Sequence, residues 1–455
     1  MTTNSKLPKI LKIMTKIFLI GLLIQFFLQT FITYELGYTT IFWKILWMWK
    51  EILLVGLLWI LIYIIQKNPE RSGRKSLRKK LPIKRFIVLF ISLIVSIGLI
   101  SLCITGTGIN AFILSIRYSM IGFFIFILFF VLKFIEQGEQ GMDMIKRYNN
   151  IIKKILIGAL IRRWIIRLMP NLLDHFGYNQ YNVEGAIGIA PPAAYYTQYN
   201  EGYVRNQFLF ERPISLWFFL IVFRPLFFIF VIKNRGRKNA LWRGGLFGLI
   251  VLSTFSRAAR IAWFFQTGML ILLQYRKKTL KILLYWIIPI LIIVGGIAYV
   301  GRNQIVARSF SDIGHLEMVI KWFEQIKEKP LWGQGAGTAG PASYQLNKEG
   351  YNPENQFLQI WIEYGIIGFI GWIALYLYLH KIGVEWYKEA IDPKKSKQDR
   401  FYGYIILAFS LGLLGLSIEG LVLHSFVDRM IVYPFMALFG IAYAVYYKNK
   451  HQIIK

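Results

Sequence analysis

Six arginines of the chain lie in long polar segments or at the edges of apolar runs: Arg205, Arg212, Arg257, Arg260, Arg302 and Arg308. A guanidinium stays charged at physiological pH, and its planar fork matches the oxygens of a phosphate. Arg212, Arg302 and Arg308 are explained equally well as interfacial side chains that extend toward anionic headgroups. Arg257 and Arg260 interrupt an apolar region, which indicates a functional role. We therefore predict that Arg205, Arg257 and Arg260 bind a phosphate-bearing substrate.

Two side chains could accept a proton next to these arginines. Glu354 stands just before the apolar run that begins at Phe357, where a carboxylate is either a cap that complements the helix dipole or a general base. His424 and Asp428 are four residues apart, so they could share one helix face. We expect them to line a polar cavity, with His424 as the reserve base. This pair lacks a third ligand, so the sequence predicts no metal site.

A glycine-rich segment precedes Glu354. Gly335, Gly337 and Gly340 match the spacing GxGxxG. That spacing alone is a weak signal for a dinucleotide site, which also requires a preceding strand in a βαβ unit, and the sequence shows no such unit. We expect these glycines to let the backbone turn tightly beside a helix end. Glu363 follows inside an apolar run, where we expect it to pair with a buried arginine.

The composition indicates a membrane protein. Hydrophobic residues make up 56% of the 455 residues and charged residues 17%, which is more apolar surface than a soluble core could hide. The net charge of +31 would also suit a nucleic-acid-binding protein, but the basic residues cluster between apolar runs. Cys103 is the only cysteine, so the chain can form neither an intrachain disulfide nor a thiolate metal cluster. We expect membrane lipids as partners and no nucleic acid.

Apolar runs of about 20 residues, the length that crosses a bilayer, recur along the chain. They predict an all-α polytopic integral membrane protein with about twelve transmembrane helices in a single domain, residues 1–455. The predicted spans are 15–34, 46–66, 86–105, 114–134, 151–170, 213–232, 244–256, 259–275, 282–300, 357–380, 401–418 and 430–447. Residues 171–212 and 301–356 remain as two larger outer loops, and the second opens with a helical apolar pattern.

The charges between the predicted spans fix the orientation of the chain. Seven segments that fall on one side of the membrane hold 35 of the 54 lysines and arginines. Cytoplasmic loops carry such an excess of basic residues, so both termini are predicted to be cytoplasmic. The first apolar run has no small-residue cleavage site after it, which favours a signal anchor over a removed signal peptide.

Four stretches resemble elements of the O-antigen ligase and polymerase family. Arg117-Tyr118 resembles the family's arginine-bearing early helix, and Arg205 followed by Pro213 resembles its arginine-to-proline stretch. Ser256-Arg257 resembles its Ser-Arg-small element. The most specific stretch is Pro330-Leu-Trp-Gly-Gln-Gly-Ala-Gly, followed by Asn355-Gln-Phe-Leu358 and Glu363-Tyr-Gly365-Ile-Ile-Gly368. The family usually has His before this Asn, where the present chain has Glu354.

The resemblance implies glycan transfer from undecaprenyl diphosphate to an acceptor hydroxyl outside the bacterial inner membrane, with no metal or other cofactor. It implies that Arg205 and Arg257 bind the diphosphate with support from Arg260, while Arg117 and Asn355 contact substrate. Glu354 would abstract the acceptor proton. A carboxylate is a weaker base than imidazole, because its ordinary pKa is about 4.3, so His424 stays as the alternative.

The acceptor distinguishes several possible activities. A ligase would use a lipid-anchored core, whereas a polymerase would use another lipid-linked glycan, and the sequence does not decide between them. A transporter or flippase of lipid-linked oligosaccharide is the main alternative, although the chain shows no inverted repeat of the kind many transporters have. A peptidoglycan polymerase is a further alternative, against which the glycine and Asn-x-x-Leu signature argues.

Overall fold

The computed structural model describes the chain in segments. The described residues are 10–22, 25, 41–67, 83–135, 140–169, 196–197, 204–205, 210, 213–253, 261–268, 309–346, 354–390, 392, 394–421 and 423–450. The predicted span 282–300 and most of the first outer loop lie outside them, as do Arg257 and Arg260.

Helices make up almost all of the described secondary structure. The longer helices are α2 (Ile41–Lys67), α4 (Lys84–Leu99), α6 (Ile121–Ile135), α7 (Gln140–Leu168), α8 (Pro213–Ser253), α12 (Ser309–Glu328), α14 (Gln356–Ala390), α15 (Lys397–Gly420) and α16 (Arg429–Lys450). Shorter ones are the π-helix η1 (Ile100–Ile104), α5 (Ile109–Ser119) and α13 (Gly340–Leu346). β1 (Tyr196–Thr197) and β2 (Val204–Arg205) form one antiparallel pair.

Four helical segments of the described chain are long and apolar enough to cross a membrane: Lys84–Ile104, Gln356–Tyr387, Lys397–Gly420 and Arg429–Lys450. A fifth arises if α5 and α6, which are bent by 64° at Met120, count as one span. The predicted span 114–134 is therefore two helices rather than one. α8 runs without interruption through two predicted spans and the basic segment expected to be a loop between them. The helical membrane architecture is confirmed, and the number of about twelve crossings stays a prediction.

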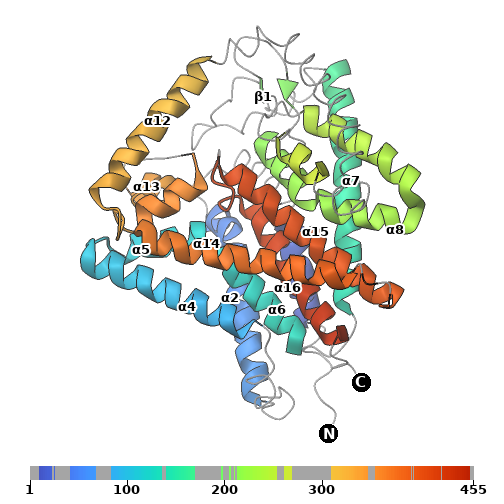
Figure 1. Ribbon diagram of the computed structural model, residues 1–455, viewed down its shortest axis with the longest axis horizontal. Coiled ribbons are helices and arrows are strands. Elements are labelled where there is room, and N and C mark those ends of the chain that lie inside the picture. Colours follow the sequence, from blue (N-terminus) through green and yellow to red (C-terminus); the bar gives the residue numbers. More distant parts are fainter. Residues whose placement is uncertain are drawn as a thin grey trace.

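α16 is the centre of the helical bundle. It packs against α6, α7, α8 and α15, and most of its side chains are buried. A helix that is apolar on all sides is stable only where other helices surround it. Figure 1 shows α16 and α15 within the bundle, while α12 and α13 lie beyond one end of α14.

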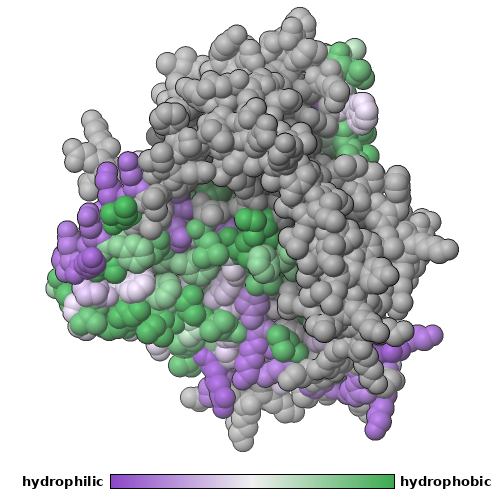
Figure 2. Space-filling model, turned by 45° about the horizontal axis from the view of Figure 1, so that its top comes forward, coloured by the Kyte–Doolittle hydropathy of each residue, from purple (hydrophilic) through white to green (hydrophobic). Residues whose placement is uncertain are grey.

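α4 lies at the edge of the bundle against α14 (Figure 1). Its buried face is made by residues spaced as one helical stripe: Phe86, Phe90, Leu93 and Ile97. Its opposite face is exposed and equally apolar: Val88, Ile91, Val95 and Leu99. Figure 2 shows that hydrophobic side chains gather on the described surface on this side of the molecule. Exposed aliphatic side chains at this density are suited to contact with lipid tails.

The glycine-rich turn is joined to α14 through backbone hydrogen bonds. Gly365 interrupts α14 with φ 64° and ψ −172°, a conformation almost confined to glycine. The carbonyls of Ile362 and Glu363 accept hydrogen bonds from Gln334 N (2.7 Å) and Gly335 N (3.1 Å). In return, Ile366 N donates to the Pro330 carbonyl at 2.9 Å. The turn therefore replaces the helical hydrogen bonds that the break at Gly365 removes.

The predicted role of the glycines is confirmed. Gly333, Gly335, Gly337 and Gly340 all have positive φ, and Gly340 is the first residue of α13. A Cβ at Gly333 would lie 2.7 Å from the Glu363 carbonyl oxygen, so only glycine permits this approach to α14.

Gly365→Ala should lower the free energy of unfolding by about 3 kcal/mol or more, because backbone strain of about 1–3 kcal/mol adds to a steric overlap. The new Cβ would overlap the Leu331 carbonyl. Gly106→Ala is the matched control, since Gly106 has φ 70° and no atom within 4 Å of the added Cβ. Thermal unfolding in detergent measures both variants. Equal losses would show that the close contact contributes nothing.

Candidate functional site

Asn355 joins the beginning of α14 to the end of α15. Its side-chain oxygen accepts hydrogen bonds from Phe357 N and Leu358 N, both at 3.0 Å, as an N-cap does. Its amide nitrogen donates to the Leu421 carbonyl at 2.8 Å. One side chain thus starts α14 and holds it against the segment between α15 and α16, residues 421–428.

Gln356 adds a second connection between the same two segments. Its side-chain oxygen accepts a hydrogen bond from Phe426 N at 3.3 Å. The Phe426 ring packs edge-on against Trp372 of α14, with centroids 5.1 Å apart. Segment 421–428, which carries His424, is therefore fixed beside the residues that follow Glu354.

Glu354 has an unusual backbone conformation. Its φ of 41° lies in the left-handed region, and it is the one non-glycine residue with positive φ in the described part of the chain. Such a conformation costs energy and persists where neighbouring contacts hold it, often at functional sites. Here the neighbouring contact is the Asn355 bridge. Glu354 as a whole is partly buried.

His424 lies outside the spanning helices and is largely neutral at physiological pH. Burial lowers the pKa of His424 from 6.5 to about 4, because the low-polarity surroundings disfavour the charged ring. The expectation that His424 and Asp428 share a helix face is wrong. Residues 425–427 form a turn, and the Asp428 carbonyl accepts the first hydrogen bonds of α16 from Ile431 N and Val432 N.

A cluster of charged residues occupies the same end of α16. We name Lys50, Glu51, Arg117 and Arg429 the Glu51 cluster. Glu51 Oε1 is 2.6 Å from Arg117 Nη2 and 3.6 Å from Arg429 Nη1, while Oε2 is 3.7 Å from Lys50 Nζ. The Arg429 guanidinium also lies over the Tyr118 ring, 5.0 Å from its centroid. The cluster thus connects α2, α5 and α16.

Glu363 is fully buried and belongs to a network of hydroxyl groups. Its carboxylate accepts a hydrogen bond from the Ser115 hydroxyl, which also contacts the Tyr364 hydroxyl. Ser119 Oγ lies 2.7 Å from the same Tyr364 oxygen. No arginine pairs with Glu363 among the described residues, and Arg257 and Arg260 lie outside them, so the expected pairing with an arginine stays a prediction. The network fixes α5, which carries Arg117, against α14.

The predicted site residues are placed to different extents. The structure brings Glu354, Asn355 and His424 to one end of the bundle, and Arg117 and Arg429 share the Glu51 carboxylate. Arg205 is paired through its backbone with Tyr196 across β1 and β2. Arg257 and Arg260 lie outside the described residues, so their roles stay predictions. The described residues contain no group of three metal-ligating side chains.

Sequence reasoning missed Lys50, Glu51 and Arg429. Lys50 and Glu51 stand near the start of an apolar run, where charges are usual at the membrane interface. Arg429 directly precedes the last span and looked like an ordinary flanking charge. One feature of the sequence could have identified the first two: Lys50 and Glu51 lie inside the predicted span 46–66, and charged residues within a membrane span often have a functional role.

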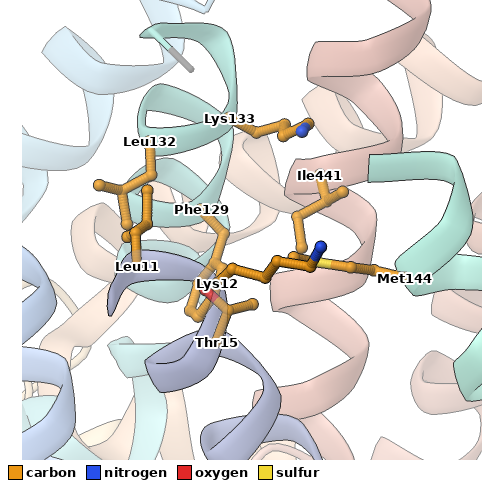
Figure 3. A pocket seen from close by; sticks show the side chains of 8 residues that line it. All are labelled: Leu11, Lys12, Thr15, Phe129, Leu132, Lys133, Met144 and Ile441. Carbon is orange, nitrogen blue, oxygen red and sulfur yellow. The ribbon is translucent and has the colours of Figure 1, made fainter. Parts of the chain in front are cut away.

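A small cavity lies toward the opposite end of α6 and α16. Lys12, Lys133 and Ile441 are among the eight side chains that line it, and Figure 3 shows them around a mainly apolar space. It encloses about 20 Å³, which is close to the room needed by one water molecule. None of the predicted site residues lines this cavity, so it is not the candidate site.

The apolar helices and this polar end define a multi-pass helical membrane protein. Residues 244–373 match the model of the family described as O-Antigen ligase. This stretch of the chain is therefore similar to the O-antigen ligase family, as the resemblance predicted, and the activity of that family is glycan transfer of the ligase or polymerase type. The match contains Glu354 and Asn355, whereas Arg117, Arg205 and His424 lie outside it. No curated protein matches the chain.

Asn355→Ser and Asn355→Ala should separate the two functions of the bridge. Serine keeps an N-cap acceptor but cannot reach Leu421, so it should lose about 1 kcal/mol from the free energy of unfolding. Alanine loses both contacts and should lose about 2 kcal/mol. Thermal unfolding measures the difference. A serine variant as stable as the wild type would show that the contact with Leu421 does not stabilise the fold.

Acidification should charge His424 only near pH 4. Its folded pKa lies below the unfolded value of 6.5, so its contribution to stability is complete above about pH 6.5 and is lost as the pH falls toward 4. His424→Gln should therefore reduce the loss of melting temperature between pH 6.5 and 4.5. Equal pH dependence in both proteins would contradict a buried neutral ring.

Proposed function

We propose that the chain transfers a glycan from a polyprenyl diphosphate, of the undecaprenyl type, to an acceptor hydroxyl at the outer face of the bacterial inner membrane. The acceptor oxygen attacks the anomeric carbon of the donor sugar, and the bond from that carbon to the diphosphate breaks. The electron pair leaves with the lipid diphosphate, and the acceptor proton goes to Glu354. The proposal includes no metal ion or cofactor.

The roles of the residues follow from the charge that develops during transfer. Diphosphate leaves readily if its growing negative charge is neutralised in a site from which water is excluded. Arg205 and Arg257 are proposed to bind the diphosphate, with Arg260 in support. Arg117 and Asn355 are proposed to contact substrate. Glu354 acts as general base, and neutral His424 is the reserve base.

One observation carries the proposal: the strained Glu354 backbone is held beside the segment that leads into Arg429. Asn355 and Gln356 bind segment 421–428. Arg429 begins α16 directly after that segment and shares Glu51 with Arg117. A proton acceptor and anion-binding groups thus belong to one continuous set of contacts, as transfer from a diphosphate requires.

The topology proposed for this function places both termini in the cytoplasm and residues 171–212 and 301–356 outside. The residues named above then face the outer leaflet, where a lipid-linked glycan is presented. Either a lipid core or a second lipid-linked glycan can serve as acceptor. The product distinguishes a ligase from a polymerase.

Glu354→Gln should lower the rate of glycan transfer by roughly 100- to 10,000-fold, the usual contribution of a general base. The amide keeps the size of the side chain but cannot take a proton. The assay follows formation of a new glycosidic product from lipid-diphosphate glycan and acceptor by purified protein without added metal. Donor binding should remain unchanged.

Glu324→Gln is the matched control, because Glu324 is exposed on α12 and undergoes the same chemical change. Normal turnover by Glu354→Gln would refute the assignment of the base. If His424→Gln alone abolished transfer, the base would be His424. Movement of the lipid-linked glycan across the membrane without a new bond would favour a transporter.

A further inference from the structure

The Glu51 cluster contains more positive than negative charge. Three basic side chains, Lys50, Arg117 and Arg429, lie within 4 Å of a single carboxylate. An ordinary surface pair of this protein, Lys381 with Glu385, has one charge of each sign. Among the described residues, Glu51 is the carboxylate that these three cations share, and one carboxylate does not neutralise three cations, so the cluster is suited to receive a further anion.

The arginines also have hydrogen-bond donors to spare. Arg117 Nε and Arg429 Nη1 are buried atoms without a hydrogen-bond partner among the described residues. The distance of 3.6 Å from Arg429 Nη1 to Glu51 is too long for a hydrogen bond. Buried donors of charged groups are costly to leave unsatisfied. An acceptor with several oxygens would satisfy them.

The cluster is both held in place and reachable. The Lys50 side chain is 1% exposed and Arg429 11%, whereas Arg117 is 27% exposed. Arg117 belongs to the last turn of α5, directly before the 64° bend at Met120. Discontinuous helices commonly form the substrate sites of membrane transporters, and here the charge for an anion comes from the Arg117 side chain.

We propose that Lys50, Arg117 and Arg429 form a phosphate-binding site in which Glu51 is a built-in competitor. In the free protein, the Glu51 carboxylate occupies part of the space between the cations and keeps them from repelling one another. A phosphate group presents more oxygens and a larger charge, so it takes over the contacts of Arg117 and Arg429. Glu51 is thus a positioning residue that lowers affinity.

The ligand is a phosphate group at a lipid surface. It belongs either to a prenyl diphosphate or to the headgroup of an ordinary phospholipid. The inference deepens the proposed function and rests on it for the identity of a prenyl-linked ligand. Lipid binding is measured in the absence of glycan transfer, so the phosphate site and the proposed transfer activity can be refuted separately.

Equilibrium binding of labelled undecaprenyl diphosphate to the purified full-length protein in detergent tests the site. Arg429→Gln should weaken binding about tenfold or more, the usual effect of losing a charge-assisted contact. Arg429→Lys keeps the charge but loses the planar fork, so its affinity should be intermediate. Glu51→Gln should bind several-fold more tightly, because the competitor is gone.

Lys381→Gln is the matched control for loss of one positive charge at an exposed position and should bind normally. The sign of the Glu51→Gln effect separates binding from a purely structural ion pair. If the cluster only joined α2, α5 and α16, Glu51→Gln would lower the melting temperature. Its affinity for the labelled lipid would then be weaker or unchanged. That result, or normal binding by Arg429→Gln, would overturn the proposal.

Competition identifies the source of the phosphate. Phosphatidylglycerol in excess should displace the labelled lipid if the site accepts any phospholipid headgroup, and inorganic pyrophosphate should displace it if the diphosphate alone is recognised. Both outcomes support a phosphate site and name its ligand. If Arg429→Gln changes neither the direct binding nor either competition, no phosphate binds there. Normal lipid binding by Arg429→Gln, together with glycan transfer by the wild-type protein, would overturn the inference and leave the proposed function intact.

Discussion

Backbone polar groups inside a membrane protein must find partners within the protein, and this constraint explains the arrangement around α14. The helix is broken at Gly365, which leaves carbonyl and amide groups without helical partners. Residues 330–335 supply two donors and one acceptor for these groups through backbone hydrogen bonds. A polar, glycine-rich segment is therefore bound to an apolar helix at its break, close to the beginning of α14.

The polar end of the bundle combines two kinds of contact. Neutral hydrogen bonds from Asn355 and Gln356 fix the chain around Glu354, whereas ion pairs around Glu51 hold the arginines. Neutral contacts of this kind do not depend on salt, and partly buried ion pairs depend on it weakly. Glu354 and the arginines of the Glu51 cluster are thus positioned by separate interactions that meet at segment 421–428.

Much of the fold could be predicted, because long apolar runs admit few structures in a membrane. The helices at 84–104, 356–387, 397–420 and 429–450 agree with predicted spans. The bend at Met120 could not be predicted, since it depends on contacts such as that from Trp372 Nε1 to the Ser119 carbonyl. The spacing of the glycines predicted a tight turn, but it did not predict that this turn forms hydrogen bonds with α14. Glu51 escaped notice because its importance depends on Arg429, which lies far away in sequence.

The left-handed backbone at Glu354 has an evolutionary consequence. Histidine, like asparagine and aspartate, enters this region of conformational space more readily than most residues. The main chain at position 354 therefore already suits the histidine that the resemblance to the O-antigen ligase family leads one to expect there. Exchange of acid for imidazole in either direction requires a new side chain but no rebuilt loop. The proton affinity at this position can thus be changed by one substitution that leaves the backbone around residue 354 as it is.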